Sequence, residues 1–129
     1  MITLYGIKTC GSVKKAIIFL DKHNIPFNFI DLKTHSLESS LIAEWIKKMG
    51  IKIVLNAKGT TYKNLKKANL IRDGLCEDSK SLLEEQVALL MQYPLLLKRP
   101  IITYRNEIII GYEQEAISAL LHKYQQDKL

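Results

Sequence analysis

Residues 2–20 have the sequence ITLYGIKTCGSVKKAIIFL, and this segment sets the fold class of the chain. Ile2 and Leu4 alternate with more polar neighbours, which is the period-two pattern of a short strand. A break follows at residues 6–11. Apolar residues then recur at helical spacing, at Val13, Ala16, Ile17 and Leu20. The segment therefore predicts a strand, a loop that contains Cys10, and a helix.

Further elements follow from local signals along the chain. Ser12 has the side chain of an N-cap for the first helix, which we expect to run to about His23. We also expect a strand at 27–32 and a helix at 37–49 that buries Leu41, Trp45 and Met49. A further helix should run from a Ser81–Glu84 capping box to Tyr93, and a hairpin should form from 101–104 and 108–110. The last helix should bury Ile117, Leu120, Leu121 and Tyr124.

This order of elements predicts an α/β fold. Two strands joined by one helix should be parallel with a right-handed crossover, and the later hairpin adds antiparallel strands. The result is a mixed sheet flanked by helices, as in thioredoxin, interrupted by an all-helical insertion at about residues 36–92. We expect residues 1–129 to form a single domain of this kind.

Composition limits the class of protein. The chain has 129 residues, 47% of them hydrophobic and 25% charged, which is typical of a globular domain and excludes a disordered one. No apolar run is long enough to span a bilayer, so we expect no membrane association. Two distant cysteines and the lack of a leader segment favour a reducing compartment, the cytoplasm. The net charge of +6 would suit a nucleic acid, an acidic partner or a small anion.

Cys10 is the candidate nucleophile. At a helix start its sulfur would face the backbone amides of Gly11, Ser12 and Val13, and this position favours the thiolate. Three lysines crowd the same turn and should add to the effect: Lys8, Lys14 and Lys15. The same loop would cradle an oxyanion. The alternative is a buried structural cysteine.

A second thiol is missing one helical turn away, because Val13 occupies that position. Cys76 could resolve a Cys10 disulfide only if the insertion folds back toward Cys10. An incidental loop cysteine, with its pKa raised by acidic neighbours, is the favoured interpretation of Cys76. A site with one thiol needs an external thiol to complete a turnover, and glutathione is the obvious candidate.

Two further segments offer cations. Arg99 and Pro100 lie just before the predicted hairpin, where Pro100 can be cis and Arg99 could bind an oxyanion or a carboxylate if it turns toward Cys10. Spacing alone favours a solvated arginine. Lys58 lies in a polar loop that could bind an anion, although such loops are more often plain surface. The isolated histidines indicate no metal site, and no nucleotide or nucleic-acid motif is present.

The chain resembles the arsenate reductase ArsC/Spx/MgsR family of thioredoxin-like proteins, and most of all its small YffB-type members. The matching motifs are ITLYGIKTC at 2–10, KKA at 14–16, LNAKGTTY at 55–62, PLLLKRPII at 94–102 and GY at 111–112. The resemblance implies that Cys10 is the nucleophile and that Arg99, beside a cis Pro100, assists oxyanion binding. For the YffB-type members it implies glutathione-dependent thiol reduction.

The chain departs from the family at three positions. Asn56 and Gly111 stand where arsenate reductases have arginines, and Val13 replaces the second cysteine of the Spx redox switch. We therefore expect a glutathione-dependent thiol–disulfide oxidoreductase with glutathione as co-substrate and no bound cofactor, acting on a thiol or disulfide substrate. The substrate and glutathione would be bound by Gly11, Ser12, Lys58, Arg99 and Pro100. The alternatives are a regulator of the Spx type that binds the RNA polymerase α subunit, without direct nucleic-acid contact, and an arsenate reductase.

Overall fold

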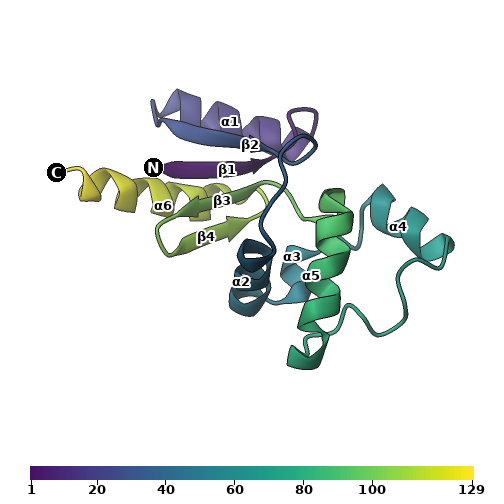
Figure 1. Ribbon diagram of the computed structural model, residues 1–129. Helices are drawn as coiled ribbons and strands as arrows, with labels where there is room; N and C mark the ends of the chain where they lie inside the picture. The colour runs from purple at the N-terminus through teal and green to yellow at the C-terminus, as the bar shows by residue number, and fades with distance from the viewer. The chain divides into compact units, whose positions relative to one another are not determined.

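A computed structural model describes residues 1–129, which form two compact units (Figure 1). The sheet unit comprises Met1–Leu32 and Arg99–Leu129, and the helical unit comprises Lys33–Lys98. The helical unit covers the insertion expected at about residues 36–92 and extends beyond it at both ends.

The sheet unit contains one four-stranded sheet with the order β2-β1-β3-β4. Its strands are β1 (Ile2–Gly6), β2 (Phe27–Asp31), β3 (Ile101–Tyr104) and β4 (Glu107–Ile110). β1 is parallel to β2 and antiparallel to β3, and β3 is antiparallel to β4. The predicted mixed sheet is confirmed. The hairpin turn is one residue shorter than predicted, because Glu107 pairs with Tyr104.

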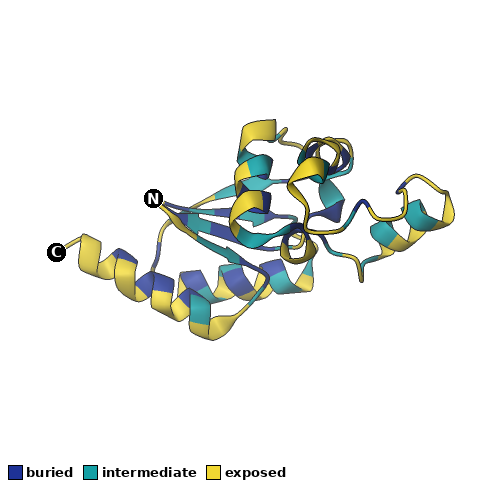
Figure 2. Ribbon diagram, turned by 90° about the horizontal axis from the view of Figure 1, so that it is seen from below, coloured by how far each residue is buried: buried dark blue, intermediate teal, exposed yellow.

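Two helices, α1 (Gly11–Lys22) and α6 (Gln114–Asp127), cover the same face of this sheet. The register aligns Leu4 with Ile102, and Ile102 with Ile109, so these side chains share that face. They form one core with apolar residues of both helices, including Val13, Ala16, Leu20, Ile117, Leu120, Leu121 and Tyr124. Figure 2 shows the buried stripe of α6 on its inner side and the exposed residues on its outer side.

Backbone groups cap both ends of α1. Cys10, with extended backbone angles, is the N-cap residue, so the Ser12 cap predicted from sequence is wrong: Ser12 lies inside the first turn. At the other end Asn24 is left-handed (φ 55°), and its N–H donates to the carbonyl of Asp21. The N–H of Ile25 donates to the carbonyl of Leu20, which completes a Schellman motif.

The helical unit contains four α-helices and two short 3₁₀ turns. They are α2 (Ser39–Met49), α3 (Ile51–Val54), α4 (Thr60–Lys67), η1 (Lys80–Leu82), α5 (Leu83–Gln92) and η2 (Pro94–Leu96). α2 packs against α5, and a single β-bridge joins Leu55 to Leu97. Gly50 ends α2 with φ +87°, a backbone conformation that glycine adopts without steric cost.

Several details of this unit differ from expectation. α2 buries Ile42, Trp45 and Ile46 rather than Leu41 and Met49. The capping box at Ser81 is absent, because its hydroxyl contacts that of Ser79 and η1 precedes α5. α3 and α4 were not predicted. α4 buries no residue and α3 has only four residues, so neither carries an apolar stripe.

No helix in the structure is long and apolar enough to cross a membrane.

Candidate thiol site

The candidate site is built around Cys10, which lies between the end of β1 and the start of α1. A tight turn places it there: the Cys10 N–H donates to the carbonyl of Ile7 (3.1 Å). The Cys10 carbonyl accepts the N–H of Lys14 (3.0 Å), the first hydrogen bond of the helix. The side chain is half-buried and touches the core only at its edge. The thiol therefore sits at the positive end of the helix dipole and is open to reagents.

Three groups acidify the Cys10 thiol. Burial by itself raises its pKa, but the backbone N–H groups of Val13 and Ser12 and the guanidinium of Arg99 lower it, and the net pKa lies below the usual cysteine value. Arg99 acts both as a hydrogen-bond donor and as a positive charge. Each of these groups stabilises the thiolate, which is the nucleophilic form of cysteine.

Arg99 comes from the far end of the sequence. It is the first residue of the sheet unit after the helical unit, and its peptide bond to Pro100 is cis. The Pro100 carbonyl accepts the N–H of Gly111 (2.8 Å), which ties the start of β3 to the end of β4. The solvated arginine that spacing alone favours is wrong, because the side chain reaches Cys10. β1 and β3 are neighbours in the sheet, and this adjacency brings residues 10 and 99 together.

Lysines have a smaller part than Arg99 in acidifying the thiol, although three were expected to act there: Lys8, Lys14 and Lys15. The Lys8 ammonium lies 5.5 Å from the centre of the Phe29 ring, which is a cation–π contact. The cation that acidifies the thiol is the Arg99 guanidinium. An arginine can bind an oxyanion or a carboxylate through two parallel hydrogen bonds, which a lysine cannot do.

Val13 fills the position where a second cysteine would stand. Its side chain is fully buried and packs directly against Gly6 at the end of β1. A β-carbon at Gly6 would lie 2.6 Å from Val13 Cγ2, so the two residues fit only because Gly6 has no side chain. Sequence reasoning missed Gly6, although the glycine at the strand end was visible.

Lys58 lies in the helical unit, in the turn between α3 and α4. Its backbone N–H donates to Asn56 Oδ1 (3.3 Å), which shapes the turn. The turn ends at Gly59, because Thr60 and Thr61 already belong to α4. A role for Lys58 at the thiol stays a prediction.

Cys76 is half-buried in the helical unit. Burial is the main reason that its pKa is raised, and Glu77 adds to the effect, while Tyr62 and Lys66 oppose it. The expected direction is confirmed, but burial is a larger cause than the acidic neighbours. Cys76 is therefore the less reactive thiol of the two, and a disulfide between them stays a prediction.

No group of three or more His, Cys, Asp and Glu side chains is arranged to hold a metal ion.

Comparison with known proteins identifies the class to which this fold and site belong. The model of the ArsC family matches residues 5–120. A curated, uncharacterized protein of Haemophilus influenzae is 33% identical over 121 residues, which is 92% of this chain and 97% of that protein. The chain belongs to the ArsC family and has the thioredoxin-like fold of its thiol oxidoreductases.

Two other relatives indicate which branches of the family lie near. The solved structure of the YFFB protein superposes with a TM-score of 0.78 at 27% identity, covering 92% of this chain and 97% of that chain. The global transcriptional regulator Spx 2 of Lactococcus lactis is 29% identical over 123 residues, which is 94% of this chain and 86% of the regulator. The chain is thus similar both to YffB-type proteins and to Spx-type regulators.

Proposed function

We propose that this protein is a glutathione-dependent thiol–disulfide oxidoreductase that works with one nucleophilic cysteine, Cys10, in the cytoplasm. One observation carries the proposal: the Cys10 thiol is acidified by Arg99 and by two helix amides. Val13, one helical turn away, cannot form a disulfide with it. Such a thiolate can attack a disulfide but needs a second molecule to release it.

The reaction has two exchange steps. In the first, the Cys10 thiolate attacks the glutathione sulfur of a glutathionylated substrate. The substrate's disulfide bond breaks, a Cys10–glutathione disulfide forms, and the substrate leaves as a thiolate that takes a proton from water. In the second, the thiolate of a free glutathione attacks the glutathione sulfur of this adduct, which regenerates the Cys10 thiolate and forms glutathione disulfide. Overall, one free glutathione and the glutathionylated substrate become the reduced substrate and glutathione disulfide, so the two electrons pass from glutathione to the substrate sulfur.

The cationic groups around the thiol would hold glutathione in place. Glutathione carries two carboxylates, and the Arg99 guanidinium is suited to bind one of them in a bidentate manner. The first-turn amides of Gly11 and Ser12 point in the direction that favours an anion. Pro100 positions Arg99 at the start of β3, and binding of the second carboxylate by Lys58 stays a prediction from the sequence.

Intact mass spectrometry after incubation with glutathione disulfide tests the proposal. We expect one glutathione adduct, on Cys10, which disappears on addition of reduced glutathione. Cys76→Ser should form the adduct as fast as the wild type, and Cys10→Ser should form none at that rate. Turnover of a glutathionylated peptide should follow the same pattern. An unreactive Cys10 with an ordinary thiol pKa would rule the proposal out.

A second candidate function is transcriptional regulation through the RNA polymerase α subunit. The supporting observation is the similarity to Spx regulators along 94% of this chain. Val13 leaves this protein without the cysteine pair by which a regulator of that kind could switch. Any such binding would therefore be independent of an internal disulfide.

A pull-down with the polymerase α subunit separates the two candidates. The regulator is favoured if binding is equal for the wild type and Cys10→Ala while neither protein reduces a glutathionylated peptide. The oxidoreductase is favoured if the wild type turns over and the α subunit is not retained. Arsenate reduction is a third candidate, and arsenate-dependent oxidation of glutathione would support it. Asn56 and Gly111, where arsenate reductases have arginines, argue against it.

A further inference from the structure

The helical unit contains a pocket that the thiol chemistry does not use. It has a volume of about 620 Å³, within the range of roughly 300–1,000 Å³ that small-molecule sites occupy. Its walls come from α2, from the start of α3 and from the segment that leads into α5. The apolar part of the lining comes mainly from three side chains, Ile46, Ile51 and Leu83.

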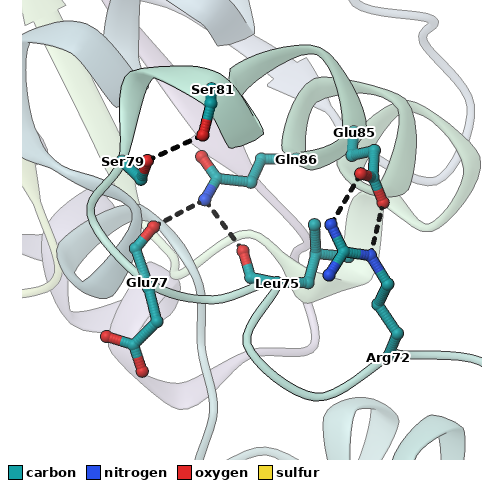
Figure 3. A network of polar contacts seen from close by, with 7 residues as sticks. All are labelled: Arg72, Leu75, Glu77, Ser79, Ser81, Glu85 and Gln86. Atoms are coloured by element: carbon teal, nitrogen blue, oxygen red, sulfur yellow. Dashed lines mark hydrogen bonds and ion pairs between the residues drawn. The ribbon is translucent and has the colours of Figure 1, made fainter.

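A buried amide lies in the wall of this pocket. Gln86 of α5 is 1% exposed, and its Nε2 donates to the carbonyls of Leu75 and Glu77, both at 2.8 Å (Figure 3). These two carbonyls fix the orientation of the amide, because only the nitrogen can donate to them. The opposite atom, Oε1, accepts no hydrogen bond from the chain and is not sealed in the interior, so it can accept one from a molecule in the pocket that Gln86 lines.

Gln86 Oε1 is suited to accept a hydrogen bond from a ligand. Water can reach Gln86 Oε1 when the pocket is empty, and a ligand that displaces this water keeps its affinity only if it replaces the lost hydrogen bond. A ligand that enters this pocket with an N–H group can satisfy Gln86 Oε1.

The pocket is lined by charged residues of both signs. Asp78 accepts the N–H of Ile51 through Oδ1 (3.1 Å), and its second oxygen has no partner in the chain. Lys47 and Lys80 line the pocket as well, and neither forms an ion pair. The pocket thus offers two acceptors that suit an ammonium group and two cations that suit a carboxylate.

We propose that this pocket binds a short peptide of apolar residues with free ends. Its terminal ammonium would donate to Gln86 Oε1 and Asp78, and its carboxylate would face Lys47 and Lys80. Its apolar side chains would pack on Ile46, Ile51 and Leu83. Size favours a dipeptide over a single amino acid, since a cavity of about 150 Å³ already holds a molecule as large as benzene. This inference does not depend on the proposed reaction of Cys10.

The test is an NMR titration of the full chain with the dipeptide leucyl-phenylalanine. We expect the shifts to concentrate at the Gln86 side-chain amide and at the methyl groups of Ile51 and Leu83. Acetylating the amino end or amidating the carboxyl end should each weaken binding about tenfold or more, as expected for loss of a charged hydrogen bond.

Two charge-reversal variants complete the test. Lys80→Glu should weaken binding at least fivefold, whereas Lys63→Glu, the same change on α4 outside the pocket, should leave it unchanged. The absence of shifts at millimolar dipeptide would overturn the proposal. Equal binding of the free and blocked peptides, or equal weakening by both variants, would overturn it too. The dispersion of the amide spectrum verifies that each variant is folded.

Discussion

Arg99 is the side chain that most distinguishes Cys10 from an ordinary helix-start cysteine, because it adds a full positive charge beside the sulfur. Replacing Arg99 with Ala removes that charge and one hydrogen-bond donor, so we expect the pKa of Cys10 to rise toward the usual cysteine value. Arg99→Lys keeps a positive charge and should give an intermediate pKa. The ultraviolet absorbance of the thiolate, followed against pH, measures the change.

Arg105→Ala is the matched control for this experiment. Arg105 belongs to the same unit but lies at the other end of β3, where it pairs with Asp127 (3.4 Å). The pKa of Cys10 should be unaffected by its loss. A Cys10 titration that is identical in the wild type and in Arg99→Ala would show that the helix amides alone acidify the thiol.

Gly6 and Val13 should behave as a coupled pair. A methyl group at Gly6 would meet Val13 Cγ2 at 2.6 Å, so Gly6→Ala should lower the free energy of unfolding by about 1–3 kcal/mol, as overpacking does. Val13→Ala removes the obstacle, and adding Gly6→Ala to it should cost much less. Urea denaturation of the single and double variants measures the coupling.

Gly11→Ala is the reference for that series, because a β-carbon there would meet no atom within 4 Å. It should not lower the free energy of unfolding, and the smaller freedom of the unfolded chain should raise it by up to about 0.4–1 kcal/mol. Strictly additive costs in the Gly6 and Val13 double variant would mean that the loop moves to relieve the contact.

At the scale of the element, a substitution at the C-terminal end of α1 should stabilise the protein. Asn24 holds the left-handed position of the Schellman motif, where glycine carries no steric cost. Asn24→Gly should therefore raise the free energy of unfolding by up to about 1 kcal/mol, the lower end of the cost that a β-carbon carries in the left-handed region. Thermal denaturation measures it, and Asn28→Gly is the control. Asn28 lies within β2, so glycine there should destabilise by a similar amount. A loss of stability in both variants would contradict the argument.

Gln86 fastens the loop before α5 to that helix. In Gln86→Leu the carbonyls of Leu75 and Glu77 lose their donor, which should cost about 1–3 kcal/mol. Gln92→Leu, at the exposed end of the same helix, should change stability by less than about 0.5 kcal/mol. Chemical denaturation compares the two variants. Equal effects would mean that the buried amide contributes nothing specific.

Elements with an apolar stripe could be predicted from sequence, and those without one could not. The alternation at Ile2 and Leu4 and the helical spacing of Ile117–Tyr124 correspond to faces that the structure buries. α4 lies at the surface of its unit and buries no residue, so no pattern marked it. The start of α1 was misplaced by two residues because a serine is the commoner cap, whereas Cys10 fills that position through its backbone.

At the scale of the whole molecule, the acidic thiol links stability to pH. The folded protein holds Cys10 at a lowered pKa, so the unfolded chain binds more protons in the interval between the two pKa values, and the stability gained from this group increases with pH there. The gain is complete above the unfolded value of about 8.5 and is lost as pH falls through the folded value. Reduced wild type should therefore gain stability relative to Cys10→Ser between neutral and mildly alkaline pH.

Denaturation of both proteins at several pH values under reducing conditions measures this difference. Cys76 is present in each, so its own titration, which has the opposite sign, cancels. A difference in stability that does not vary with pH would contradict a lowered pKa for Cys10.

The site could be predicted only in part, because its members come from distant parts of the sequence. Cys10 stood out through its local position at a helix start. Arg99 did not, since a strand order that places β3 beside β1 is a property of the whole sheet and not of any spacing. Gly6 escaped notice for a similar reason: its importance depends on the side chain of Val13, which packs against it only in the folded state.

The valine one turn after Cys10 has a consequence for how this protein would respond to its surroundings. An enzyme with two neighbouring cysteines closes its own disulfide and releases two glutathiones, so its oxidised fraction depends on the square of the glutathione concentration. A single thiol in mixed disulfide with glutathione exchanges one molecule for one. Its oxidised fraction then follows the ratio of glutathione disulfide to glutathione and is indifferent to dilution of the whole pool. With Val13 in place, Cys10 would report redox balance and not the amount of thiol in the cell.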